Sequence, residues 1–231
     1  MKTLKLVHSL VIASTSLVVS ISSMQAAHAG RNKNEVSNSP LTAFRDDLFT
    51  NRGRRILEER EKGAVVLYDW NYQESVLDRD AVEGEVAKPE RIDTEVTAHR
   101  VDRAVSIEGQ KLEFFSVGAE KNANFVVIFI HGAGGTKDIG ASDVRFGANF
   151  NHIQSLALRN NGLYLSPTLP LDMNGGRLLA GLIEKVRESS PKSKVILACG
   201  SAGAALCNVA AASDFGRTLN GLIYLGGSGF P

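Results

Sequence analysis

Ser201 has the sequence surroundings of a nucleophile. An apolar run over residues 195–199 predicts a buried strand, which ends at Gly200-Ser201-Ala202-Gly203, and the alanine-rich segment that follows predicts a helix. The glycines allow a sharp turn, and the helix start offers free N–H groups and a positive dipole end to an oxygen that becomes negative. The same pattern is typical of a closely packed strand-to-helix turn without chemistry. This motif alone leaves both interpretations open.

A second glycine-rich segment lies upstream of Ser201. Residues 125–130 form another continuous apolar run, and it ends at His131-Gly132-Ala133-Gly134-Gly135. No G-x-x-x-x-G-K-[ST] or G-x-G-x-x-G pattern follows a predicted strand, which argues against a nucleotide site. Together the two segments resemble the α/β-hydrolase family of serine esterases and lipases, with Cys199 in place of the first glycine of G-x-S-x-G.

The resemblance implies a hydrolase that acts on a carboxylic ester or a related small acyl substrate. Ser201 would attack the substrate and form an acyl-enzyme, without a metal ion or a cofactor. The oxyanion hole would consist of the backbone N–H of Ala202 and that of Ala133 or Gly134. His131, in the oxyanion motif, is implied to be structural.

The family resemblance also implies a triad acid and then a histidine after the nucleophile. Asp214 is the only acidic residue that follows Ser201, it comes too soon after the predicted helix for this role, and no histidine follows. We therefore expect the chain to lack the part of the module that carries the acid and the histidine, and to be a weak catalyst as it stands. The alternatives are a relative that only binds a ligand, and a fragment without stable function.

The elements around these motifs alternate between strands and helices. This alternation predicts the α/β class, with a mostly parallel sheet, helices on both faces and the site at the carboxyl ends of the strands. We expect a β-hairpin over 96–101 and 111–117, strands over 125–130, 162–166, 195–199 and 219–225, and helices over 146–160, 174–188 and 203–213.

Residues 1–29 have the pattern of an export signal. Two lysines precede an apolar, uncharged segment, and Ala27-His28-Ala29 is an A-x-A cleavage site. Cleavage leaves 24 basic residues (26 less Lys2 and Lys5) against 25 acidic ones. We expect a periplasmic or secreted protein, without stable membrane insertion after cleavage, and the charge balance favours no nucleic-acid partner. The sequence does not indicate an oligomeric state.

Residues 30–95 predict a polar extension before the hydrolase core of residues 96–231. We expect a short amphipathic helix from Leu41 through Leu57 and a charged, solvated helix face over 52–62. We also expect a strand over 64–70 and a surface loop over 78–91. Tyr68, Trp70 and Tyr72 could cover a pocket, but we favour a small satellite core for them.

Cys199 and Cys207 are expected to be buried and unpaired. They lie on a strand end and on the helix that follows, where we expect their side chains to be too far apart for a disulfide. No cluster of His, Cys, Asp and Glu has the spacing of metal ligands, so no metal centre is predicted.

Overall fold

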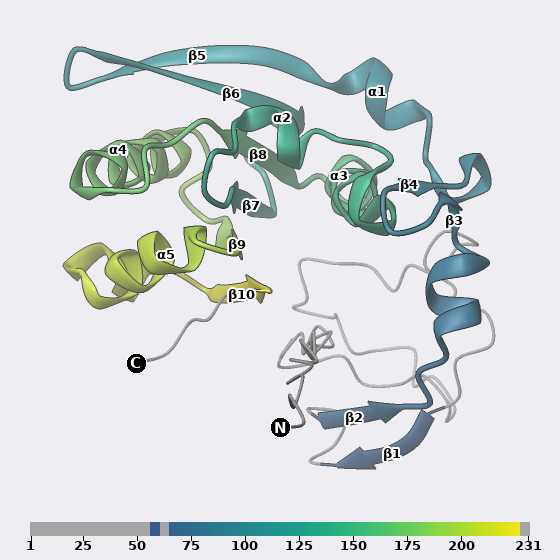
Figure 1. The fold of residues 1–231 in the computed structure, drawn as a ribbon. Helices are drawn as coiled ribbons and strands as arrows, with labels where there is room; N and C mark the ends of the chain where they lie inside the picture. Colours follow the sequence, from purple (N-terminus) through teal and green to yellow (C-terminus); the bar gives the residue numbers. More distant parts are fainter. Residues whose placement is uncertain (1–55, 61–64, 227–231) are drawn as a thin grey trace, which may run out of the picture.

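The computed structural model describes residues 56–60 and 65–226 (Figure 1). The expected export signal at residues 1–29 and the expected helix start near Leu41 lie outside the described residues. Among the helices within them, none has the length and apolar character needed to cross a bilayer.

A six-stranded sheet forms the centre of the molecule. Its strands are β5 (Val101–Ile107), β6 (Gln110–Gly118), β7 (Phe125–Ile130), β8 (Leu163–Pro167), β9 (Lys194–Gly200) and β10 (Gly221–Leu225). The strand order is β10-β9-β7-β8-β6-β5. Strands β8, β7, β9 and β10 run parallel, while β6 is antiparallel to β8 and to β5. The prediction of an α/β fold with a mostly parallel sheet is confirmed.

Helices cover both faces of this sheet. They are α1 (Glu95–His99), α2 (Lys137–Gly140), α3 (Asn149–Arg159), α4 (Met173–Ser189) and α5 (Gly203–Ala212), with 3-10 turns at Arg145–Ala148 and Asp214–Thr218. In the edge-on view of Figure 1, α4 and α5 lie on one side of the sheet and α3 lies on the other. Ile128 of β7 packs in the same cluster as Leu179 of α4, whereas Phe129 packs with Phe150 of α3. Because both faces are buried, β7 is apolar throughout, and β9 is apolar from Val195 to Cys199.

The prediction of a first hairpin strand over residues 96–101 is wrong for most of that range. Residues 95–99 form α1, and β5 begins only at Val101. Val96 is fully buried in the cluster that contains residues of α3, and the Asp93 carboxylate accepts the N–H of Glu95 at 3.0 Å, at the start of the helix. Packing and this hydrogen bond outweigh the alternating pattern that predicts a strand.

Buried polar side chains fasten the residues around α1 to α3. The Asp93 carboxylate accepts hydrogen bonds from Ser155 Oγ at 2.6 Å and from Arg159 Nη2 at 2.7 Å. Burial opposes the charge on Asp93, but the hydrogen bonds from Ser155, Arg159 and the N–H of Glu95, with the positive charge of Arg159, together outweigh burial. The pKa of the carboxyl is therefore lowered. Asn151 Nδ2 donates both to the Asp93 carbonyl and to the Asp143 carboxylate. These side chains form one hydrogen-bonded network.

Residues 56–60 and 65–68 form two paired strands where the sequence predicts the end of a helix. β1 (Ile56–Arg60) pairs antiparallel with β2 (Val65–Tyr68). The predicted helix and its charged face are therefore wrong here, since the ion pair between Glu58 and Arg60, at 2.6 Å, lies along a strand. The strand predicted over 64–70 is confirmed for residues 65–68, which form β2.

The predicted loop over 78–91 also contains regular structure. After a π-helical segment, Gln73–Leu77, come β3 (Asp80–Val82), β4 (Val86–Ala87) and a 3-10 turn, Pro89–Arg91. The buried Asp80 carboxylate accepts hydrogen bonds from Arg79 Nε at 2.6 Å and from the N–H of Gly84 at 2.9 Å. A buried carboxylate inside the turn thus fixes a short hairpin that composition alone does not indicate.

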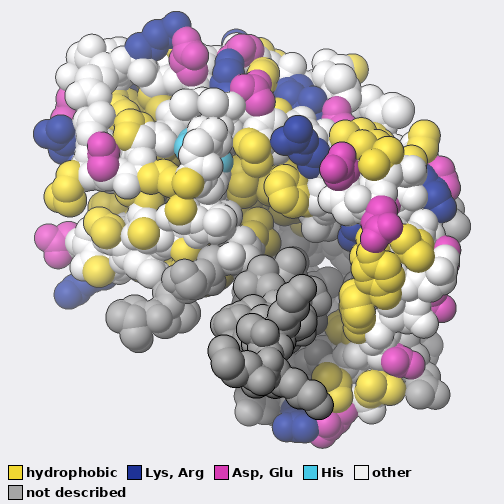
Figure 2. Space-filling view, in the orientation of Figure 1, with side chains coloured by type: hydrophobic (Ala, Val, Ile, Leu, Met, Phe, Trp, Pro, Cys, Tyr) yellow, Lys and Arg dark blue, Asp and Glu magenta, His cyan; other side chains and the backbone are white. Residues whose placement is uncertain are grey.

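The aromatic residues of this region are not a satellite core. Tyr68, Trp70 and Tyr72 are 40%, 51% and 45% exposed. Hydrophobic side chains are visible at the surface on this side of the molecule, at the right of Figure 2. The expectation that these three rings pack together in a buried cluster is wrong.

Candidate functional site

Ser201 lies at the sharp turn between β9 and α5. Its φ angle is +46°, in the left-handed region that a residue with a side chain rarely adopts. Its N–H donates to the carbonyl of Leu225, the last residue of β10, at 3.0 Å. The residue is exposed. A strained backbone angle that neighbouring strands hold in place is a common feature of functional residues, and here it presents a hydroxyl to solvent.

Gly132 and Gly203 allow the loop after β7 and the turn at Ser201 to lie close together. A side-chain carbon at Gly203 would be 2.5 Å from the His131 carbonyl oxygen, so only glycine lets α5 begin this close to the end of β7. A side-chain carbon at Gly132 would be 3.0 Å from the Cβ of Ser201 and 3.6 Å from its Oγ. The loop after β7 therefore lies against Ser201, as the predicted position of the oxyanion motif requires.

The loop after β7 offers backbone donors beside Ser201. It turns through a hydrogen bond from the N–H of Gly135 to the carbonyl of Gly132, at 3.1 Å, with Gly134 at a φ of +68°. Within the described residues, the N–H groups of Ala133, Gly134 and Ala202 donate to no protein acceptor. These are the three N–H groups that the family resemblance of the sequence implies for an oxyanion hole.

His131 holds the loop after β7 in place. The ring is 3% exposed, and its Nε2 accepts the N–H of Leu169 at 3.1 Å. The proton then belongs to Nδ1, which donates to the carbonyl of Gly132 at 2.8 Å. Because both ring nitrogens are engaged, His131 ties the loop after β7 to the loop after β8 and has no lone pair free to accept a proton from Ser201.

The other side of this loop is anchored to β8. Ser166 Oγ donates to the carbonyl of Lys137 at 2.7 Å, and the Tyr164 hydroxyl donates to the carbonyl of Gly140 at 2.8 Å. Burial raises the pKa of Tyr164, so its hydroxyl stays protonated and acts as a donor. Fixed anchors at both ends preorganise the loop, which is what oxyanion donors need in order to stabilise charge.

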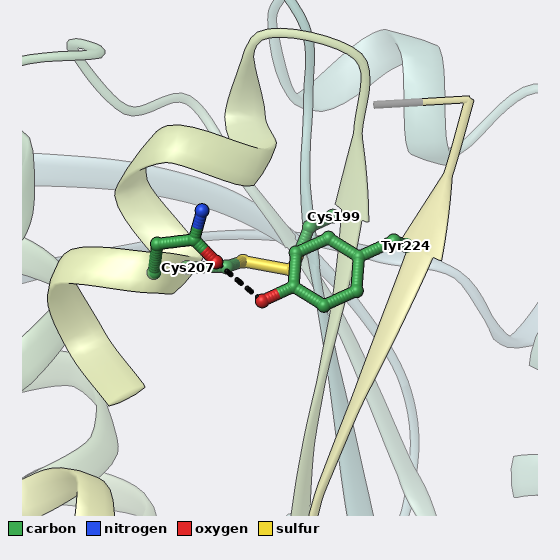
Figure 3. Close-up of a disulfide and its surroundings, with 4 residues drawn as sticks. Cys199, Cys207 and Tyr224 are labelled. Atoms are coloured by element: carbon green, nitrogen blue, oxygen red, sulfur yellow. Dashed lines mark hydrogen bonds between the residues drawn. A yellow bond between two sulfur atoms is a disulfide. The ribbon is translucent and has the colours of Figure 1, made fainter. Parts of the chain in front are cut away.

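Cys199 and Cys207 form a disulfide, and the expectation of two unpaired cysteines is wrong (Figure 3). Their Cα atoms are 6.3 Å apart, within the usual range for a disulfide. The helix turns back along β9 after the elbow, so its second turn faces the end of the strand that it has just left. Burial of both cysteines is confirmed, at 0% exposure each.

No triad partner of Ser201 lies in the part of the chain that the structure describes. The Ser201 hydroxyl makes no hydrogen bond there. His152 Nε2 lies 2.6 Å from the carbonyl of Arg91, and the exposed ring of His99 lies beside Glu95. Asp214 follows the far end of α5, whose ten residues span about 15 Å. No group of three His, Cys, Asp or Glu suited to a metal ion occurs among the described residues.

The strand order and the turn at Ser201 between β9 and α5 define an α/β protein with a mostly parallel sheet. No family model and no curated protein matches the chain. Among solved structures, it is similar to a bacterial membrane phospholipase A described as a virulence factor, with 17% identity over 58% of this chain and 42% of that one, and a TM-score of 0.44.

Two epoxide hydrolases of known structure are similar to this chain, with identities and TM-scores close to those of the phospholipase. The enzyme from Vigna radiata is 15% identical over 54% of this chain and 38% of that one, with a TM-score of 0.42. The enzyme from Aspergillus niger is 13% identical over 55% of this chain and 34% of that one, also with a TM-score of 0.42. The match thus spans between about a third and two-fifths of the length of these three proteins.

Proposed function

We propose that the protein is a serine hydrolase that cleaves a carboxylic ester through an acyl-enzyme on Ser201. The observation that carries the proposal is an exposed serine with a φ of +46° between a strand and a helix, with free backbone N–H groups on the adjoining loop. Such a turn presents a nucleophile beside donors for an oxyanion.

The proposed reaction runs in two halves. Ser201 Oγ attacks the carbonyl carbon of the ester while a general base accepts its proton, and the oxyanion is stabilised by the N–H of Ala202 with that of Ala133 or Gly134. The alcohol leaves with that proton, and water then releases the acid and frees Ser201. Each well-aimed donor is worth about 3 kcal/mol in such a site.

No general base for Ser201 is present among residues 56–60 and 65–226. His131 is excluded, because both of its ring nitrogens are already hydrogen-bonded. Without a base, catalysis by binding and the oxyanion hole alone is about a thousandfold or more below that of a complete triad. The proposal therefore includes slow turnover by the chain as it stands.

We also propose that the protein works outside the cytoplasm, in the periplasm or after secretion. The buried disulfide between Cys199 and Cys207 supports this location, because such bonds form and persist mainly in oxidising compartments. The export pattern of residues 1–29 points the same way. In this proposal the substrate is a small acyl compound, with no nucleic-acid partner and no stable membrane insertion.

Labelling with a fluorophosphonate probe tests the proposal. The wild-type protein is treated alongside Ser201→Ala, and the release of p-nitrophenol from p-nitrophenyl acetate is followed in parallel. Labelling and ester cleavage that both disappear in the variant support the proposal. A folded wild-type protein without labelling, or labelling that survives in Ser201→Ala, overturns it.

A second candidate is a protein that binds an acyl ligand without turnover. It is favoured by the Ser201 hydroxyl, which has no hydrogen-bonded base among the described residues. In that case p-nitrophenyl acetate would raise the melting temperature of the protein without release of p-nitrophenol or labelling of Ser201. Ester cleavage that depends on Ser201 excludes this candidate.

A further inference from the structure

We infer that the disulfide between Cys199 and Cys207 positions Ser201, and that the elbow takes its working geometry only once this bond has formed. The inference rests on the proposed function of Ser201. It assigns to the two cysteines a role in the site itself, beyond the general stability of the fold.

The bond encloses the whole elbow. Cys199 precedes Ser201 by two residues on β9, and Cys207 follows it by six on α5, with a separation of eight between the cysteines. The closed segment therefore contains the nucleophile and the N–H of Ala202. A cross-link at these two positions restricts how far α5 can tilt or slide relative to β9.

Little else on α5 resists such a movement. The helix begins without a side-chain hydrogen bond to its first turn and without an acidic residue there. Of its buried residues, Gly203, Ala204 and Ala210 are small, and Leu206 is the only long apolar side chain. Since the apolar area that a side chain buries determines how firmly it holds a helix, the disulfide takes the place of larger core residues.

The strained angle at Ser201 makes this restraint matter for the site. A residue with φ at +46° returns to an ordinary angle unless both flanking segments are held. The strand side is fixed by the bond from Ser201 to Leu225, and the helix side by the disulfide. A hydrogen bond of 2.5 Å between Tyr224 and Asn208 adds a second link from α5 to the sheet (Figure 3).

Formation of the bond requires an oxidant. Two cysteine thiols become one disulfide, while an acceptor disulfide takes up the two electrons and two protons and becomes two thiols. Because both sulfur-bearing residues are fully buried in the folded protein, the exchange takes place before the core closes. Reductants that reach the folded protein later have no access to the bond.

The test compares a variant without the bond to a matched control. Cys199→Ala/Cys207→Ala removes the cross-link, and Leu182→Ala removes a buried side chain of α4 on the same face of the sheet. All proteins are studied at a temperature at which circular dichroism shows them folded. Hydrogen exchange is measured at the amides of Ser201 and Ala204, and the rate of fluorophosphonate labelling is measured in parallel.

We expect both amides to exchange about tenfold faster or more in the cysteine variant, and labelling to slow by a similar factor. Leu182→Ala should change neither by more than about twofold. If the double alanine variant does not fold, Cys199→Val/Cys207→Ala fills more of the vacated space and replaces it. Wild-type protein refolded with dithiothreitol should behave like the variant, and oxidised glutathione during refolding should restore it.

The outcomes separate the two proposals. If wild-type protein is not labelled, the proposed function fails, and hydrogen exchange alone decides whether the disulfide fixes the elbow. If the cysteine variant keeps wild-type exchange at Ser201 and Ala204, the inference is overturned. It is also overturned if Leu182→Ala has the same effect on these two amides as loss of the disulfide.

Discussion

The backbone of Gly203 packs directly against the carbonyl group of His131, since a side-chain carbon at position 203 would be 2.5 Å from that oxygen. We expect Gly203→Ala to lower the free energy of unfolding by about 1–3 kcal/mol and to slow the labelling of Ser201, because α5 must move away from β7. Gly176→Ala on α4 is the control, since the nearest atom to the added carbon would be 3.8 Å away. Equal losses in the two variants, measured by urea unfolding, would contradict this prediction.

We expect the left-handed backbone angle at Ser201 to lower the free energy of unfolding. Ser201→Gly and Ser201→Ala both remove the hydroxyl, but only glycine adopts a φ of +46° without strain. We therefore expect the glycine variant to be more stable than the alanine variant by about 0.5–1 kcal/mol, with labelling lost in both. Thermal unfolding of the two variants side by side measures the difference, and an alanine variant at least as stable as the glycine variant would refute the prediction.

The hydrogen bonds of His131 predict a role in positioning. His131→Gln keeps a side chain that can accept from the N–H of Leu169, whereas His131→Ala leaves that buried donor unpaired, at a cost of about 1–3 kcal/mol. We expect the glutamine variant to retain labelling of Ser201 within about tenfold of wild type and the alanine variant to lose both stability and labelling. A loss of a thousandfold or so in both variants would instead indicate that His131 acts as the base.

Acid should weaken the network around Asp93. Its folded-state pKa is below the ordinary value of 3.8, so its stabilising contribution is present above that value and is lost as the pH falls through the folded-state pKa. We expect Asp93→Asn to be less stable than wild type by about 1–3 kcal/mol at pH 7, and the difference to shrink as the pH falls below about 4. Urea unfolding from pH 7 to pH 3 tests this, with exposed Glu184→Gln as the control. A difference that stays constant with pH would contradict it.

The parts of the fold that could be predicted from the sequence are those with one dominant pattern. β7 and residues 195–199 of β9 are buried on both faces and are apolar throughout. The helical spacing of Leu179 and Ile183 on α4 matches a single buried face. Ser201 could be singled out because a strand, a glycine-flanked serine and a helix start follow one another directly. These signals are local, and the structure retains them.

The parts that could not be predicted depend on contacts between distant residues. Val96 is helical because it packs near α3 and because Asp93 binds the start of its helix, which a window of neighbouring residues does not reveal. The disulfide was missed because sequence spacing shows the separation of Cys199 and Cys207 along the chain, not the return of α5 along β9. Two features of the sequence indicate this disulfide. Cys199 replaces the first glycine of the G-x-S-x-G pattern, and Cys207 follows Gly203 by about one helical turn.

The link from Ser201 to Leu225 makes the site depend on the outermost strand of the sheet. Among the strands that the structure describes, β10 pairs only with β9, and its side chains are half-buried along its whole length. An edge strand of this kind detaches at a smaller free-energy cost than unfolding of the core. Mild heating should therefore abolish the reactivity of Ser201 while the central strands remain intact, and cooling should restore it. The highest temperature at which Ser201 reacts would then be set by the detachment of β10 from β9 and not by global unfolding.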